Sequence, residues 1–309
     1  MEQTPSYPLR ALSIGEIFDR AVTIFMRNFV TLTAIVASMI APYSVAQYFV
    51  ISPDRAGLAG VLSQMQHPGK STPMPPEMIG AVFGLAFIAL LLAPIVNNAV
   101  AVGVADLYNG REPQYGRSYA VVFRRVWPLI ATAIVAAFLV GAIYMGFVMV
   151  LAVVAIFGVA LVKVFLPLAI VLFVLVGIGI LAMILALLMM LLVYAFATYS
   201  TTLEGAGVAA AVGSAFRRIF NRTEFRKAAL MALAYLALEI AVLTLSSTVS
   251  VVVELVLKSY AVELAVSAIF SSVLNAFLVT LLAVYYFDVR TRSEGLDLEV
   301  DLGRLTAAP

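Results

Sequence analysis

The sequence predicts an all-α, polytopic membrane protein with six transmembrane helices. Hydrophobic residues make up 63% of the 309 residues and charged residues only 12%, whereas soluble domains are roughly half apolar and a quarter charged. Several apolar stretches exceed the roughly 20 residues that a helix needs to cross a bilayer. A basic, amphipathic segment precedes each pair of apolar stretches. Because lipid offers no hydrogen-bond partners to an open backbone, such spans must be helices.

The amphipathic segments share a core of aromatic and basic residues. The cores are FMRNF at 25–29, FRRVW at 123–127 and FRRIF at 216–220. We therefore predict three repeats, each a surface helix followed by a transmembrane hairpin, at 12–110, 111–205 and 206–290, with a cytoplasmic tail at 291–309. The alternative is that aromatic and basic residues gather at every membrane boundary without any duplication.

The first amphipathic segment, Leu12 to Phe29, is predicted to be a surface helix. Ser13 and Glu16 fit a capping box, in which each side chain bonds the backbone N–H of the other residue. Apolar residues recur at helical spacing and form one stripe: Ile14, Ile17, Phe18, Ala21, Ile24 and Phe25. We expect this stripe to lie at the headgroup boundary of the membrane. Packing on a soluble core is the alternative, and the long apolar stretch that follows disfavours it.

The first pair of spans is expected at about 28–51 and 78–106, joined by a polar, proline-rich loop at 52–77. Pro42 and Pro94 interrupt these spans, which is tolerated where neighbouring groups satisfy the freed carbonyls. The second surface helix follows, and Tyr119, Val122, Phe123 and Val126 form its apolar stripe.

Lipid contacts are expected where the surface helices meet the spans. Trp127, the only tryptophan, lies where an interfacial anchor belongs. Basic residues at this level should attract anionic lipid headgroups. The predicted contacts are Arg27, Arg124, Arg125, Trp127, Arg217 and Arg218.

The region from Pro128 to Thr202 contains a single charged residue, Lys163. We predict two helices, at about 128–158 and 166–199, with a turn near Lys163. Both are longer than a bilayer requires, which implies tilt or projection beyond it. Three shorter spans would fit the same length, but they would move everything downstream to the opposite side of the membrane.

The last pair of spans is expected at about 228–252 and 262–287, after a third surface helix at about 207–221. The second, fourth and sixth spans share a weaker signature, a tyrosine and then a glycine where the span ends. These pairs are Tyr108 and Gly110, Tyr199 and Gly205, and Tyr286 and Gly295.

The distribution of basic residues predicts the orientation. With six spans and a cytoplasmic N-terminus, all but four of the 19 Lys and Arg residues lie on the cytoplasmic side. The four on the other side are Arg55, Lys70, Lys163 and Lys258. The positive-inside rule favours this arrangement, so both termini are expected in the cytoplasm.

Polar residues on the last two spans form two candidate stripes. Glu239 lies near the middle of the fifth span, where an ionisable group is costly and is a candidate functional residue. We predict that the stripes meet in a polar seam made of Glu239, Ser246, Ser250, Glu263, Ser267, Ser271 and Asn275. The seam would serve either as hydrogen-bonded packing between helices or as a path for a solute or proton; the third possibility is that the stripes do not meet.

A second candidate polar cluster is the pair Asn97 and Asn98, which follows Pro94 on the second span. A helix broken at a proline can expose carbonyls that coordinate an ion or a substrate. Asparagine in a span more often hydrogen-bonds neighbouring helices and has no further role.

The sequence shows no signature of an enzyme. It has no cysteine, and its single histidine, His67, lies in the first loop. The H-E-x-x-H, G-x-S-x-G and P-loop motifs are absent, so we expect no catalytic residues, no metal site and no cofactor. The net charge of +2 does not suggest nucleic-acid binding.

Both ends of the chain resemble a bacterial membrane-protein family. The resemblance is carried by LRALSIGEIFDR at 9–20 and YFDVRTRSEGLDLE at 286–299. This family is the membrane domain of glycerophosphoryl diester phosphodiesterases, together with stand-alone relatives of unassigned function. The resemblance implies the architecture and a bacterial inner-membrane location. It does not imply the phosphodiesterase activity, because the catalytic domain of the fused enzymes has no counterpart here.

Three functional hypotheses follow. The first is an integral membrane protein without catalysis that binds a membrane or cytoplasmic partner protein, or organises anionic lipids. The second is a small-solute or lipid transporter that uses the polar seam around Glu239. The third is a membrane subunit for a separately encoded enzyme, by analogy with the fused relatives.

Overall fold

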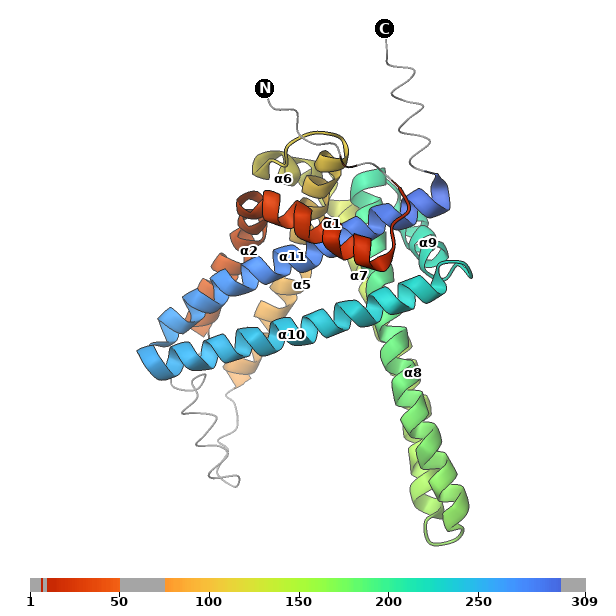
Figure 1. Cartoon of the computed structure of the whole chain (residues 1–309). Coiled ribbons are helices and arrows are strands. Elements are labelled where there is room, and N and C mark those ends of the chain that lie inside the picture. Colours follow the sequence, from red (N-terminus) through yellow and green to blue (C-terminus); the bar gives the residue numbers. More distant parts are fainter. Residues whose placement is uncertain (1–6, 8–9, 51–75, 296–309) are drawn as a thin grey trace. The chain divides into compact units, whose positions relative to one another are not determined.

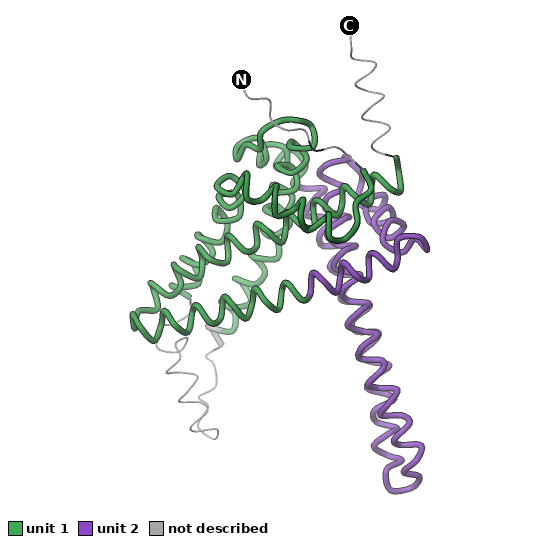
Figure 2. Tube along the Cα trace, viewed as in Figure 1, with its two compact units in different colours: residues 1–126, 237–309 green, residues 127–236 purple. Residues whose placement is uncertain are grey.

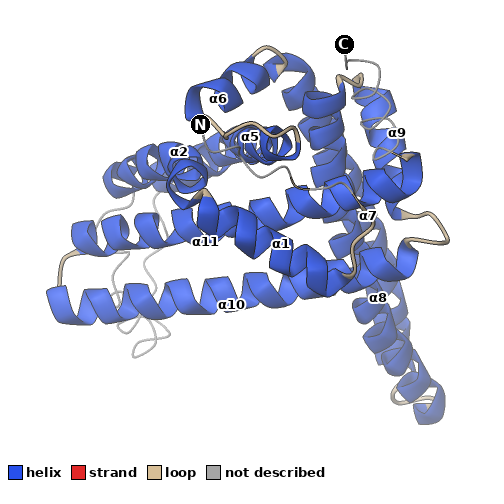
Figure 3. Cartoon of the chain, turned by 45° about the horizontal axis from the view of Figure 1, so that its top comes forward, coloured by secondary structure: helices blue, strands red, loops and turns tan. Residues whose placement is uncertain are grey.

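The computed structural model describes residues 7, 10–50 and 76–295, and within them the chain is helical with no strand (Figure 3). Six of the helices are long and apolar enough to cross a membrane. They are α2 (Phe29–Val50), α5 (Pro76–Tyr108), α7 (Val126–Leu161), α8 (Leu166–Tyr199), α10 (Phe225–Leu257) and α11 (Tyr260–Glu294). The predicted all-α polytopic fold is therefore confirmed.

Short helices precede the odd-numbered spans in the chain (Figure 1). They are α1 (Ile14–Arg27), α6 (Tyr115–Phe123) and α9 (Val208–Ile219), and a π-helical turn, η1 (Ser200–Glu204), continues α8. The two long helices predicted between 128 and 199 are present, so the three-span alternative is wrong. The division into three repeats stays a prediction.

Several helices run further than the sequence indicated. The fifth and sixth spans were expected to end near 252 and 287, but α10 continues to Leu257 and α11 to Glu294. The first residues of the predicted tail therefore belong to α11. The rest of that tail, 296–309, lies outside the described residues, as do His67 and most of the predicted loop, 51–75.

The chain divides into two units, 1–126 with 237–309, and 127–236 (Figure 2). In the first unit, α2 packs on both α5 and α11, and α1 packs along α11. The second half of α11 forms the core of this unit, and Leu278, Leu281 and Tyr285 are fully buried there.

Helix α1 begins with the predicted capping box. The hydroxyl of Ser13 accepts the backbone N–H of Glu16, and the Glu16 carboxylate accepts the N–H of Ser13 at 2.7 Å. The hydrogen bond from the Ser13 backbone, followed by the contact with Arg10, lowers the pKa of Glu16 to about 2. Glu16 therefore stays ionised, and caps the helix, throughout the physiological pH range.

The apolar face of α1 corrects one expectation. Ile17, Ala21 and Ile24 are fully buried, and Phe25 meets Phe277 of α11 edge to face, with ring centroids 5.8 Å apart. The stripe is covered by protein and not by lipid headgroups, because α11 extends far enough to offer an apolar surface. The exposed apolar residues of α1 lie on its other side, at Val22 and Met26.

The second unit contains the hairpin of α7 and α8. Gly158 lies against Phe173, where an added Cβ would come within 3.3 Å of the ring, and the hydroxyls of Thr132 and Thr201 are 2.9 Å apart. Helix α7 has 36 residues, which at about 1.5 Å per residue gives roughly 54 Å. This exceeds the hydrocarbon thickness of about 30 Å, so the hairpin must tilt or extend beyond the bilayer.

A left-handed glycine ends each of three long helical segments. Gly110 follows α5 with φ 68°, Gly205 follows η1 with φ 76°, and Gly295 follows α11 with φ 63°. At the end of α5, the N–H of Gly110 bonds Leu107 and that of Arg111 bonds Asp106, which is a Schellman motif. These are the glycines that the sequence placed at the span ends.

Replacing Gly205 by alanine should destabilise the protein, because a left-handed conformation costs a residue with a Cβ about 1–2 kcal/mol. Gly205→Asn should cost less, since asparagine tolerates this conformation. Thermal unfolding in detergent would measure both. The control is Gly213→Ala inside α9, where nothing lies within 4 Å of the new Cβ. An equal loss in the two alanine variants would contradict the role of the left-handed cap.

Candidate functional site

The structure brings together part of the predicted polar seam. The hydroxyls of Ser250 on α10 and Ser267 on α11 are 2.6 Å apart, and Ser267 donates to the carboxylate of Glu263 at 3.2 Å. These side chains are half-buried. They link the two helices close to the turn that joins them.

The remaining members of the predicted seam lie further along these helices. Asn275 donates its amide to the carbonyl of Ser271 on its own helix at 2.8 Å. Ser246 and Glu239 are half-buried on α10, and Glu239 is roughly three helical turns from Ser250. The contacts between Ser250, Ser267 and Glu263 are of the kind that holds two helices together.

The two asparagines of α5 have different surroundings. Asn98 is fully buried, and its amide donates to the carbonyl of Pro94 at 2.8 Å. Its side-chain oxygen has no hydrogen-bond partner among the described residues. Asn97 is only half-buried. The amide of Asn98 thus has a local role, a hydrogen bond to the carbonyl of Pro94 one turn earlier on the same helix.

A buried carboxylate lies near the end of α5. The side chain of Asp106 is 5% exposed and lies 3.4 Å from Arg111 and 3.2 Å from Arg117. Arg117 belongs to α6, which packs on α5. Burying a carboxylate is costly unless it is paired, so this pair fixes how α6 folds back onto α5.

The end of α8 carries a second paired carboxylate, whose side chain is 18% exposed. Glu204 in η1 pairs with Arg218 of α9 at 2.9 Å and accepts a hydrogen bond from the hydroxyl of Ser200 at 2.9 Å. Arg218 is 6% exposed. The pair anchors α9 on the end of α8, with which it packs.

The third carboxylate, Asp288 near the end of α11, holds the start of α1. Its side chain is fully buried and accepts the backbone N–H of Leu12 at 2.6 Å. Arg292 pairs with the same carboxylate at 3.3 Å and also donates to the carbonyl of Leu12. A charged acceptor thus satisfies a backbone group just before α1 begins.

We call Asp106, Glu204 and Asp288 the helix-end carboxylates. Each lies near the end of a long helix and binds the short helix that packs on it, or in the case of Asp288 the residue just before that helix. Sequence reasoning missed all three. The available signal was an acidic residue within about two turns of each left-handed glycine.

The predicted interfacial residues divide into two groups. Arg27, Arg124, Arg125 and Arg217 are exposed, and Trp127 is 78% exposed. The prediction is wrong for Arg218, which is buried against Glu204. Helical spacing alone could not separate adjacent arginines, because the carboxylate that binds one of them comes from another helix.

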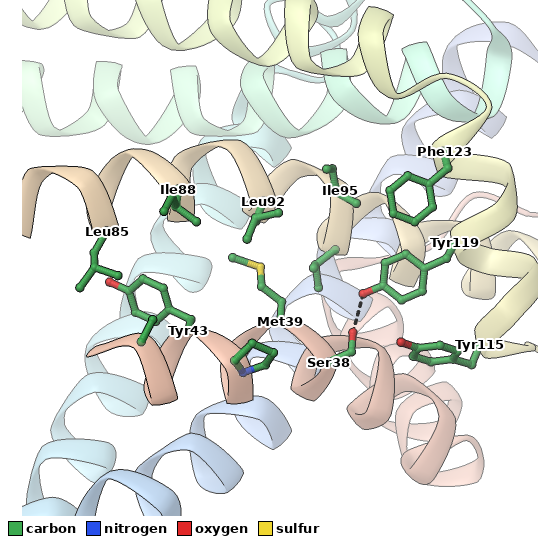
Figure 4. A pocket seen from close by; sticks show the side chains of 13 residues that line it. Ser38, Met39, Tyr43, Leu85, Ile88, Leu92, Ile95, Tyr115, Tyr119 and Phe123 are labelled. Carbon is green, nitrogen blue, oxygen red and sulfur yellow. Dashed lines mark hydrogen bonds between the residues drawn. The ribbon is translucent and has the colours of Figure 1, made fainter. Parts of the chain in front are cut away.

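An apolar cavity of about 510 Å³ lies between α2 and α5, next to α6 (Figure 4). It is lined by Ser38, Met39, Pro42, Tyr43, Ala46, Leu85, Ile88, Leu92, Ile95, Val96, Tyr115, Tyr119 and Phe123. A second apolar cavity of about 450 Å³ lies between α2 and α11. Glu239 lines neither of them.

Comparison of the chain with protein-family models, with curated proteins and with solved structures found no match. Among the described residues, no group of three or more His, Cys, Asp or Glu side chains is arranged to hold a metal ion.

Replacing Asp288 by asparagine should loosen α1 from α11. Losing a charged hydrogen-bond acceptor costs about 2 kcal/mol, which corresponds to roughly thirtyfold faster exchange. Hydrogen exchange of the amides between 12 and 27 would measure this. Asp19→Asn is the control, because Asp19 is exposed on the same helix. Unchanged protection in the Asp288 variant would show that the carboxylate does not hold α1.

Proposed function

We propose that this protein is an integral membrane component without catalysis of its own, which organises anionic lipids at the cytoplasmic face of the bacterial inner membrane. The observation that supports the proposal is the exposure of the arginine side chains near the short helices. Arg218 is buried against Glu204, whereas Arg27, Arg124, Arg125 and Arg217 are exposed. Exposed arginines near a membrane surface attract anionic headgroups.

Aromatic residues beside these arginines support the proposal. Phe123 is 56% exposed, Trp127 is 78% exposed and Phe220 is 44% exposed. Aromatic rings gather at the level of the headgroups, so these side chains set the depth at which the arginines lie. A guanidinium held at that depth meets phosphate directly and not through bulk water.

The orientation of the chain in the membrane, expected from the distribution of its Lys and Arg residues, is part of this proposal. Both termini are cytoplasmic, and α1, α6 and α9 lie at the cytoplasmic surface as the first elements of three repeats. The left-handed glycines and the packing of each short helix on the end of a long one support a repeated design.

A protein partner remains part of the proposal. The spans α7 and α8 bury almost none of their most apolar windows within the chain, 0% and 6% respectively. Such a surface suits lipid or another membrane protein. By its resemblance to the membrane domain of the fused phosphodiesterases, the chain could also serve as the membrane subunit of a separately encoded enzyme, and this argument is by analogy alone.

Removing the exposed arginines should reduce the enrichment of anionic lipid around the protein. Each basic residue near an anionic surface contributes about 1 kcal/mol. The combined variant Arg27→Gln, Arg124→Gln, Arg125→Gln and Arg217→Gln should therefore lose most of the enrichment. Polymer-bounded membrane discs and lipid mass spectrometry would measure the ratio of phosphatidylglycerol to phosphatidylethanolamine around the protein. Lys163→Gln, an exposed charge in the turn between α7 and α8, is the control. A ratio equal to that of the bulk membrane in the unaltered protein would refute the proposal.

The transport hypothesis is the second candidate, and the observation behind it is Glu239, an ionisable residue that is half-buried within the candidate span α10. If it is correct, Glu239→Gln should abolish flux, because the amide cannot carry a proton or balance a cation. A pH-sensitive dye in proteoliposomes would follow proton movement, with Glu263→Gln as a comparison. Under our main proposal, neither the unaltered protein nor Glu239→Gln moves protons faster than the passive proton leak of the liposomes.

A further inference from the structure

We infer that the cavity between α2 and α5 holds one acyl chain of an anionic phospholipid whose headgroup is bound by Arg124 and Arg125. The inference rests on the proposed function and adds to it a defined site. The cavity contains no charged residue in its lining, and its volume of about 510 Å³ falls within the roughly 300–1,000 Å³ typical of ligand sites.

The lining combines buried and exposed side chains. Leu85, Ile95 and Val96 are buried, whereas Ile88 and Leu92 are 49% and 37% exposed. Both walls belong to predicted transmembrane helices. The only polar side-chain groups in the lining are the hydroxyls of Ser38, Tyr43, Tyr115 and Tyr119. A polar solute would lose its hydration here and regain few hydrogen bonds, so a hydrocarbon chain that enters from the lipid is the occupant that fits.

Pro42 explains why space remains between the helices. It lies inside α2 and lines the cavity. A proline in a helix interior removes a backbone hydrogen bond and bends the helix, and its small ring fills less volume than leucine or phenylalanine. Ala46, one turn further on, also leaves room.

Three aromatic residues of α6 cover one end of the cavity (Figure 4). The rings of Tyr115 and Tyr119 meet edge to face with centroids 5.1 Å apart, and those of Tyr119 and Phe123 stack at 5.9 Å. The hydroxyl of Tyr119 lies 2.7 Å from that of Ser38 and donates to the carbonyl of Ile35 at 2.9 Å. These bonds tie the cover to α2.

The cover remains neutral and apolar. Burial raises the pKa of Tyr119, and the hydrogen bond with Ser38 acts in the opposite direction. The phenol therefore keeps its proton at physiological pH and continues to donate to the backbone of α2. An alkyl chain can pack beneath these rings without meeting a charge.

The position of Phe123 connects the cavity to the headgroup site. Phe123 lines the cavity and Arg124 and Arg125 follow it directly, both exposed. A phospholipid has the same order of parts, an apolar chain beside an anionic head. The second cavity lacks this combination, because none of its lining residues neighbours an arginine in the sequence.

Native mass spectrometry of the detergent-purified protein would test the inference, with palmitoyl-oleoyl phosphatidylglycerol or phosphatidylcholine added as the probe. We expect the unaltered protein to retain one phosphatidylglycerol after the other lipids are stripped by collisional activation. Ala46→Phe and Leu92→Phe, which fill the cavity from α2 and from α5, should each lower its occupancy at least tenfold. Ala41→Phe places the same ring in the second cavity and should leave the occupancy unchanged.

The variant Arg124→Gln with Arg125→Gln separates the chain site from the headgroup site. It should retain a lipid but lose the preference for phosphatidylglycerol over phosphatidylcholine. If this variant still prefers phosphatidylglycerol to phosphatidylcholine, Arg124 and Arg125 do not bind the headgroup, and the proposed function fails at this helix. In that case, loss of the lipid in Ala46→Phe would still support the site for the acyl chain. Absence of a retained lipid in the unaltered protein, or full occupancy in both cavity-filling variants at unchanged thermal stability, would overturn the inference.

Discussion

The burial of a carboxylate at the end of a long helix is the constraint on which the rest of the structure depends. The side chains of Asp106 and Asp288 are 5% and 0% exposed and that of Glu204 is 18% exposed, and each is matched by a guanidinium or a backbone N–H. Each carboxylate binds a group on a short helix or on the residue just before one, so the short helix is drawn onto the end of the long one. After α5 and after η1 a left-handed glycine, Gly110 or Gly205, turns the chain toward the short helix that follows.

This arrangement places the exposed arginines. Arg117 pairs with Asp106 although its side chain is 42% exposed, and so holds α6, which the exposed Arg124 and Arg125 follow directly. Arg218 is buried against Glu204, whereas its neighbour Arg217 is exposed. The same docking places α6 over the cavity between α2 and α5, where its aromatic rings become the cover. One electrostatic constraint thus positions both features that support a lipid-binding role.

The fold was largely predictable because its signals are local. Hydrophobic length identified the six spans, and Ser13 with Glu16 located the start of α1. The ends of α10 and α11 were misjudged, since both helices continue through polar residues such as Glu254 and Asp288. For the site, residue spacing identified the stripes of α10 and α11 but not which of their hydroxyls would meet. It also could not show that Arg218 is buried while Arg217 is exposed.

The sequence by itself determined that the chain is helical and crosses the membrane repeatedly, because each span must satisfy its own backbone bonds in lipid. It also determined which ends of the helices carry the basic residues. Only the tertiary structure decided that Asp288 binds Leu12, that protein covers the apolar face of α1, and that a cavity remains beside Pro42. These features depend on contacts between residues far apart in the chain. The spacing of residues within one helix does not show which other helix packs against it.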